Sequence, residues 1–117
     1  MSSEQATAVT QATLTTLAER IDGGEARDLA DQLPSGLGAY AFGGSETAER
    51  FGLDVFVDRV SGRADLDVDA ARDGVTAVFD VLRDALDPSG YEQVITQLPA
   101  EYADVADQTG PFVRRQA

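Results

Sequence analysis

The sequence predicts an all-α fold, a compact bundle of six or seven helices that forms one soluble domain. Apolar residues recur at spacings of three and four along most of the chain, and no useful length alternates with the period of two that marks a strand. The chain also aligns with itself, without gaps, at a shift of 65 residues, which indicates an internal helical repeat. Its 117 residues, 43% of them apolar, can bury a core without a disulfide or a metal.

The repeat is clearest in two copies of the tripeptide Gln-Leu-Pro. At the shift of 65, residues 32–34 fall on residues 97–99 and Asp22 falls on Asp87. We therefore expect two copies of one helical unit, related by an approximate two-fold axis.

The expected boundaries follow from this repeat. Repeat one spans about 2–41, repeat two about 67–106, and a linking helix at about 51–64 lies between them. Together these form a single domain, 1–107, and a loosely ordered tail with a Gly-Pro break follows at 108–117.

Each repeat is predicted to hold a long helix followed at once by a short one. Ser2 with Gln5, and Asp22 with Glu25, have the spacing of capping boxes at the two helix starts of repeat one. Each short helix is expected to end at Gln-Leu-Pro, because the residue before a proline is pushed out of the helical region. The apolar stripe of the first long helix comprises Ala6, Val9, Thr13, Leu14, Leu17 and Ile21.

Repeat two shows the same signals more strongly. Asp67 can cap its long helix, and Asp87 its short helix, with Pro88 at the first position, where a missing N–H costs nothing. After each Gln-Leu-Pro we expect one further turn or two, at 37–41 and 101–106. The apolar stripes are Leu53, Phe56, Val57 and Val60 in the linking helix, then Val68, Ala71, Val75, Val78, Phe79, Leu82 and Leu86.

The net charge of −12 is the strongest compositional signal. Asp outnumbers Glu by 14 to 7, and all nine basic residues are Arg. Either the acidic surface docks on a basic partner, or it is the surface of a protein adapted to concentrated salt. The absence of Lys and the abundance of Asp, Ala, Val and Thr favour the second interpretation. Both interpretations argue against nucleic acid as a partner, because phosphate contacts need Lys and Arg.

Several chemistries are excluded by composition. The chain has no cysteine and no histidine, which removes thiolate catalysis, disulfides and the commonest transition-metal ligand. We expect no cofactor and no metal. No stretch approaches the ~20 apolar residues of a membrane span, and the N-terminal residues lack the pattern of a signal peptide, so we expect a cytoplasmic protein without a membrane partner.

Two patterns resemble functional motifs only in part. Asp65, Asp67 and Asp69 alternate like the start of an EF-hand loop, but Ala70 and Thr76 stand where Gly and Glu are needed, so we interpret the acids as residues at a helix N-terminus, where the macrodipole favours them. The glycines between residues 36 and 44 lack the strand and the Lys of a phosphate-binding loop, and predict a flexible connection, or alternatively a lid over a groove.

Taken together, these elements resemble a known family, numbered 2267 among the domains of unknown function. The similarity covers about Glu4 to Val105. It implies an all-helical fold and carries no established reaction, so no catalytic residue is assigned from it. Gly36 and Gly38 depart from the family pattern, where larger or charged residues are expected. The residues that carry the resemblance are Leu14, Leu17, Ile21, Asp22 and 32–34, then Phe51, Leu53, Asp54, Phe56 and Val60, then Leu82, Leu86, Asp87, 97–99 and Tyr102.

We expect a non-enzymatic interaction or regulatory module that binds an unidentified protein partner or a second copy of itself. The candidate surface residues are Gln32, Gln97, Tyr40, Phe42 and Tyr102. The two glutamines are expected either to cap neighbouring helix ends or to face a ligand at the centre of the repeat.

Two alternatives stay open. The first is a binding domain for a small apolar or amphipathic ligand between the repeats, in a pocket lined by Phe42, Phe56, Phe79, Tyr91 and Tyr102. The second is a hydrolase that uses carboxylates alone, which requires two acids of raised pKa in one cleft.

Overall fold

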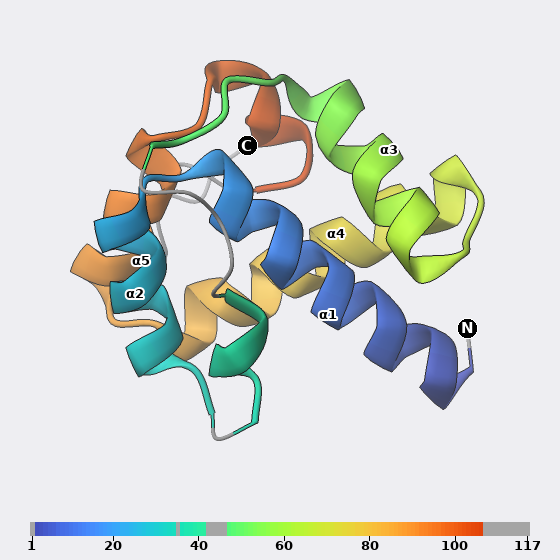
Figure 1. Ribbon diagram of the computed structural model, residues 1–117, viewed down its shortest axis with the longest axis horizontal. Helices are drawn as coiled ribbons and strands as arrows, with labels where there is room; N and C mark the ends of the chain where they lie inside the picture. The colour runs from blue at the N-terminus through green and yellow to red at the C-terminus, as the bar shows by residue number, and fades with distance from the viewer. Residues whose placement is uncertain (1, 35, 42–46, 107–117) are drawn as a thin grey trace, which may run out of the picture.

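Helices make up the regular secondary structure of the computed structural model, which describes residues 2–34, 36–41 and 47–106 (Figure 1). This part of the chain contains no strand, so the predicted all-α class is confirmed. Its five α-helices and two 3-10 helices are α1 (Ser3–Arg20), α2 (Gly23–Gln32), η1 (Gly38–Ala41), α3 (Leu53–Ala64), α4 (Val68–Ala85), α5 (Pro88–Thr96) and η2 (Ala100–Asp104).

The segments after the two Gln-Leu-Pro motifs are shorter than α-helices. The backbone N–H of Tyr40 donates to the carbonyl of Leu37, and that of Tyr102 to the carbonyl of Pro99, both at 3.0 Å. These i to i+3 bonds define a 3-10 turn, which rarely extends beyond four residues. The described residues therefore form five α-helices, fewer than the six or seven helices that the sequence predicted.

Side chains cap the helix starts where the sequence predicted caps. The Ser2 hydroxyl accepts from the Gln5 N–H at 3.1 Å, and the Gln5 side chain accepts from the Ser2 N–H at 2.9 Å, which completes the capping box of α1. The Asp67 carboxylate accepts from the Ala70 N–H at 2.8 Å and opens α4. Asp67 and Asp69 therefore lie at the N-terminus of α4 as predicted, whereas Asp65 is the C-cap residue of α3, in the left-handed conformation at a φ of 56°.

The two halves of the chain follow the same order of elements. The long helices α1 and α4 each have 18 residues and begin at Ser3 and Val68, which lie 65 positions apart. The short helices α2 and α5 have 10 and 9 residues and begin at Gly23 and Pro88, which also lie 65 positions apart. In Figure 1 α2 and α5 lie side by side, α1 packs against α4, and α3 covers both long helices.

One apolar core joins all of these helices. Phe56 of α3 lies at its centre, with 0% of its surface exposed, and contacts the rings of Phe79 and Tyr102 at centroid distances of 6.2 and 5.7 Å. The radius of gyration is 13.2 Å, close to the ~13 Å expected of a compact domain of this length.

Candidate functional site

The two glutamines of the Gln-Leu-Pro motifs make reciprocal hydrogen bonds between α2 and α5. The Gln97 side-chain oxygen accepts from the Asp22 backbone N–H at 2.9 Å, and the Gln32 oxygen accepts from the Asp87 N–H at 3.1 Å. Asp22 and Asp87 are the N-cap residues of α2 and α5. Each amide therefore caps the short helix of the other half, which is the structural alternative predicted for both residues.

This arrangement corrects the second predicted capping box. The Asp22 carboxylate accepts from the Glu25 N–H at 2.8 Å, but the return bond from Asp22 is made to Gln97 rather than to Glu25. One N–H cannot serve both acceptors, and the amide from the other half takes it.

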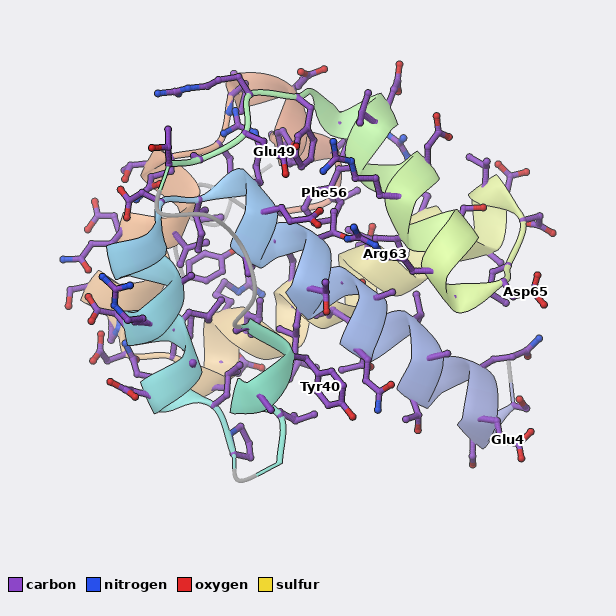
Figure 2. All side chains as sticks on the ribbon, in the orientation of Figure 1. Glu4, Tyr40, Glu49, Phe56, Arg63 and Asp65 are labelled. Carbon is purple, nitrogen blue, oxygen red and sulfur yellow. The ribbon has the colours of Figure 1, made fainter. Side chains whose placement is uncertain are left out.

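The aromatic candidates lie apart from these glutamines. Tyr40 is half-buried against the core, and its carbonyl accepts from the Thr15 hydroxyl at 3.1 Å (Figure 2 labels it). Tyr102 is fully buried, and its hydroxyl donates to the Phe51 carbonyl at 3.0 Å. Burial raises the pKa of this hydroxyl, which keeps it protonated as a donor. Phe42 lies outside the described residues.

Four of the five aromatic residues predicted to line a pocket are buried in the core, and the fifth, Phe42, lies outside the described residues. Phe56, Phe79 and Tyr102 have no exposed surface, and Tyr91 is buried too. Their rings pack on one another, with an edge-to-face contact between Phe56 and Tyr102 at an interplanar angle of 87°. These buried side chains contribute to the stability of the core.

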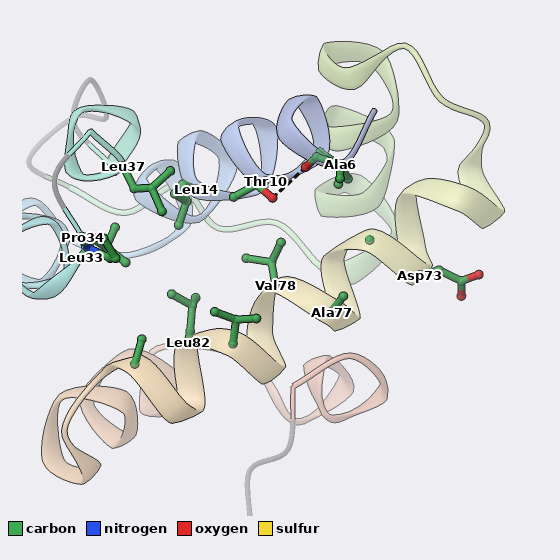
Figure 3. Close-up of a pocket in the computed structure, with 14 residues that line it drawn as sticks. Ala6, Thr10, Leu14, Leu33, Pro34, Leu37, Asp73, Ala77, Val78 and Leu82 are labelled. Atoms are coloured by element: carbon green, nitrogen blue, oxygen red, sulfur yellow. Dashed lines mark hydrogen bonds between the residues drawn. The ribbon is translucent and has the colours of Figure 1, made fainter. Parts of the chain in front are cut away.

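The structure instead contains an apolar groove at another place between the two halves, along α1 and α4 (Figure 3). Its volume is about 310 Å³. One wall is α4, and the other is the stretch of α1 from Ala6 to Leu14 together with the segment that joins α2 to η1. The lining residues are Ala6, Val9, Thr10, Leu14, Leu33, Pro34, Leu37, Asp73, Gly74, Ala77, Val78, Val81, Leu82 and Ala85.

The groove presents very few polar groups to an occupant. The Thr10 hydroxyl donates to the Ala6 carbonyl at 2.8 Å, within its own helix. Asp73 lies at the edge, and its carboxylate points away from the groove in Figure 3. Val81 on the rim is 63% exposed, the largest exposed fraction among the large apolar side chains that the structure describes.

The floor of the groove forms where α1 and α4 approach most closely. A Cβ atom placed on Gly74 would lie 2.5 Å from Cγ2 of Val9. Glycine in the middle of a helix lowers stability, but at position 74 its lack of a side chain allows α1 to pack against the backbone of α4. Gly74 lets the two long helices cross in contact, and the groove opens beside this crossing.

The two edges of the groove differ in charge. Asp80 and Asp84 are exposed and follow Asp73 at positions that place all three acids on one stripe of α4, along its solvent side. Thr7 and Gln11 of α1 lie beside Thr10 and Leu37 on the opposite edge. Among the described residues that line the groove, none is basic.

A polar network lies on the far side of α1, against α3. The Glu19 carboxylate accepts from Arg59 at 2.9 Å and from Arg63 at 2.7 Å, and Figure 2 shows Arg63 between the two helices. Burial alone would raise the pKa of Glu19, but the two arginines outweigh it and hold the pKa below 4.5. The same arginines leave Glu19 a poor proton donor, and the network fastens α3 to α1.

Arg20, the next residue, is buried in the core. Its exposed fraction is 3%, its Nε donates to the Phe51 carbonyl at 2.8 Å, and its guanidinium faces the Phe51 and Tyr102 rings. Its Nη1 has no hydrogen-bond partner among the described residues. Arg20 therefore ties the segment before α3 to the end of α1.

The carboxylate with a raised pKa among the described residues is that of Glu25, near the start of α2. Burial raises the pKa of Glu25, with a further contribution from Asp28 and Asp22. In the part of the chain that the structure describes, no group of three or more acids is placed to hold a metal ion. Nor does that part contain a helix with the length and apolar character needed to cross a membrane.

The sequence prediction missed the groove, although a signal for it is present. Ala77, Val81 and Ala85 repeat every four residues on α4, next to the buried stripe but outside it. All three are exposed in the structure. When the apolar stripe of a helix is wider than the face that the core covers, the surplus residues form an exposed apolar surface such as this groove.

Comparison with known proteins gives a family but no relative of known activity. The model of the family described as uncharacterized conserved protein DUF2267 matches residues 1–105. No curated protein and no solved structure matches the chain significantly. Because the matched residues cover the two long helices, α3 and both Gln-Leu-Pro motifs, the chain belongs to the DUF2267 family.

Proposed function

We propose that this chain is a non-enzymatic interaction module, which binds the apolar face of a protein partner in the groove between α1 and α4. The observation that carries the proposal is the exposure of Val81, at 63%, beside a continuous apolar lining. Exposed apolar patches with a polar rim are typical of interaction sites.

The free energy available from this surface suits a binding site. Covering the exposed part of Val81 contributes roughly 1–2 kcal/mol, because full burial of such a side chain is worth about 1.5–3 kcal/mol. Ala77 and Ala85 lie on the same exposed stripe and would be covered with it. An occupant that covers the stripe gains from several side chains at once.

A second candidate function is the binding of a small apolar or amphipathic ligand between the repeats. The groove lies between the two halves, and its volume of about 310 Å³ reaches the lower end of the range of ligand pockets. A ligand pocket normally offers a few polar groups that fix orientation, and the Thr10 hydroxyl is already bonded to Ala6. This favours a partner that needs no polar anchor inside the groove.

Two further interpretations belong to the same proposal. The equal offset of α1 and α4 and the reciprocal bonds of Gln32 and Gln97 support a duplicated unit with an approximate two-fold axis. The net charge of −12, without Lys, supports adaptation to concentrated salt. We place the module in the cytoplasm.

A neutral, environment-sensitive dye such as Nile red tests whether the groove accepts an apolar occupant. We expect the folded chain to bind the dye and Val81→Gln to weaken that binding. Val55→Gln is the matched control, because Val55 is 42% exposed on α3 and does not line the groove. Equal effects of the two substitutions, or no dye binding by the native chain, would contradict the proposal.

A further inference from the structure

The geometry points to one class of partner for this groove: an amphipathic helix of another protein, with basic side chains along one flank of its apolar face. This inference rests on the proposed function and makes it specific. It combines the shape of the groove, the exposure of its rim and the unequal charge of its edges.

The shape of the groove fits a short helix. The lining along α4 runs from Asp73 to Ala85, a span of about 18 Å at 1.5 Å per residue. A partner helix of about 12 residues has the same length. Helices that dock in apolar grooves present anchors at i, i+3 or i+4, and i+7, which need an apolar trough and no polar contacts inside it.

The unequal charge of the two edges determines which flank of the partner helix should carry basic side chains. Asp73, Asp80 and Asp84 follow the solvent edge of α4, whereas Thr7 and Gln11 follow the edge of α1. A docked helix therefore meets three carboxylates on one flank, whereas the other flank has Thr7 and Gln11, with the single carboxylate of Glu4 at the outer end of the same stripe. Lys or Arg on the first flank would form charge-assisted hydrogen bonds at contact, which salt screens less than it screens long-range attraction.

The same charges argue against a second copy of the chain as the occupant. Each copy carries a net charge of −12, and in a two-fold dimer through this groove both copies bring an acidic edge, while the described lining residues bring no basic side chain to the interface. Like charges across an interface disfavour that pairing. A basic partner turns this repulsion into attraction.

The test uses the full chain and three synthetic peptides of about 14 residues that share one apolar helical face, with Leu at the anchor positions. The flank that meets α4 carries Lys in the first peptide, Gln in the second and Glu in the third. Affinities are measured by fluorescence anisotropy at the lowest potassium chloride concentration that maintains full helicity. We expect the Lys peptide to bind about tenfold more tightly than the Glu peptide, because several weak ion pairs at the rim add their contributions to the binding free energy.

Two pairs of variants connect this preference to the groove. Asp80→Asn with Asp84→Asn should remove most of the preference for Lys. Asp54→Asn with Asp58→Asn is the matched control, because these acids are also exposed, have the same spacing and lie on α3, which does not line the groove. Val81→Gln should weaken all three peptides by about tenfold, through the loss of apolar contact.

Each other outcome overturns the inference in a recognisable way. Equal affinity for the three peptides, still weakened by Val81→Gln, removes the charge preference and leaves the interaction module standing. No peptide binding, together with Nile red binding that depends on Val81, favours the small ligand and removes both. Tighter peptide binding by Arg114→Gln with Arg115→Gln identifies the chain's own terminal segment as the competitor. A dimer in light scattering that Val81→Gln dissociates identifies a second copy.

Discussion

At the scale of single residues, two glutamine side chains connect the two halves of the molecule. Gln97 reaches the N-cap of α2, and Gln32 reaches the N-cap of α5. The first N–H groups of a helix have no partner within the helix, and each amide oxygen supplies one from the other half. The Gln-Leu-Pro motif thus ends one short helix and caps the other.

Removal of either amide should lower the stability of the whole chain. We expect Gln97→Ala and Gln32→Ala each to reduce the free energy of unfolding by about 1 kcal/mol, the usual net value of a hydrogen bond. Urea denaturation followed by circular dichroism measures the change. Gln93→Ala is the control, because Gln93 is exposed on α5, and its loss should change stability by no more than about 0.5 kcal/mol. If the three variants are alike, the caps do not stabilise the fold.

A second residue-scale prediction concerns Glu19 and the dependence of stability on pH. Its pKa is lowered by Arg63 and Arg59, so its contribution is fully present above pH 4.5 and is lost as the pH falls through the lower value in the folded state. Glu19→Gln should lower the unfolding free energy at neutral pH by roughly 1–2 kcal/mol, as expected of partly buried, charge-assisted bonds.

The difference between native chain and variant should disappear on acidification below the folded pKa of Glu19. Urea midpoints measured from about pH 7 to about pH 3 follow this change. Glu92→Gln is the comparison, because Glu92 is an exposed residue of α5. A Glu19 effect that persists undiminished at the acidic end contradicts the assignment of this network.

At the scale of elements, the crossing of α1 and α4 determines both the core and the groove. Gly74 and Val9 meet at the crossing, and no larger residue fits at position 74 without displacing the Val9 side chain. Valine is stiff about its first side-chain torsion, so it yields little.

Gly74→Ala should therefore destabilise the chain although alanine favours helix. Overpacking costs about 1–3 kcal/mol and the better helix propensity returns about 1 kcal/mol, so we expect a net loss of about 1 kcal/mol. Gly62→Ala should instead stabilise the chain, because a Cβ at that exposed position of α3 meets no atom within 4 Å. Thermal unfolding of the two variants gives the signs, and stabilisation by both would mean that the helices do not touch at Gly74.

The elements themselves could largely be predicted from the sequence. Caps such as Ser2 and Asp67, the proline stops and the apolar stripes act over a few residues, so they locate the helices without knowledge of the tertiary fold. The further turns after the two Gln-Leu-Pro motifs lie where the sequence predicted them, at η1 and η2, but a proline does not determine whether the turn that follows it is α or 3-10.

The site was harder to predict, because it depends on which helices meet. Tyr102 and Phe56 are of the residue types that often line pockets, but they fill the core because α3 covers both long helices. The groove depends on a surplus of apolar positions on α4, such as Val81, and a single sequence shows that surplus only after the packed face is known. Partners of the two glutamines lie 55 and 75 residues away, beyond any local rule.

At the scale of the whole molecule, the dominant electrostatic feature is the net charge of −12. Self-repulsion of this size opposes the compact state and is screened by salt. We expect helicity and resistance to urea to rise between ~0.1 M and ~3 M potassium chloride, where the Debye length falls to about 3 Å. Far-UV circular dichroism with light scattering measures both. Full helicity and an unchanged urea midpoint across this range contradict the interpretation of the acidity as adaptation to salt.

The most direct test of the account follows the valine methyl groups by NMR while the Lys-flanked peptide is added to the full chain. Val78 and Val81 line the groove, whereas Val55 is exposed on α3. We expect the methyl signals of Val78 and Val81 to shift on binding and the signals of Val55 to stay unchanged. Shifts centred on Val55, or binding that leaves Val78 and Val81 unchanged, would contradict the claim that the groove between α1 and α4 is the functional surface.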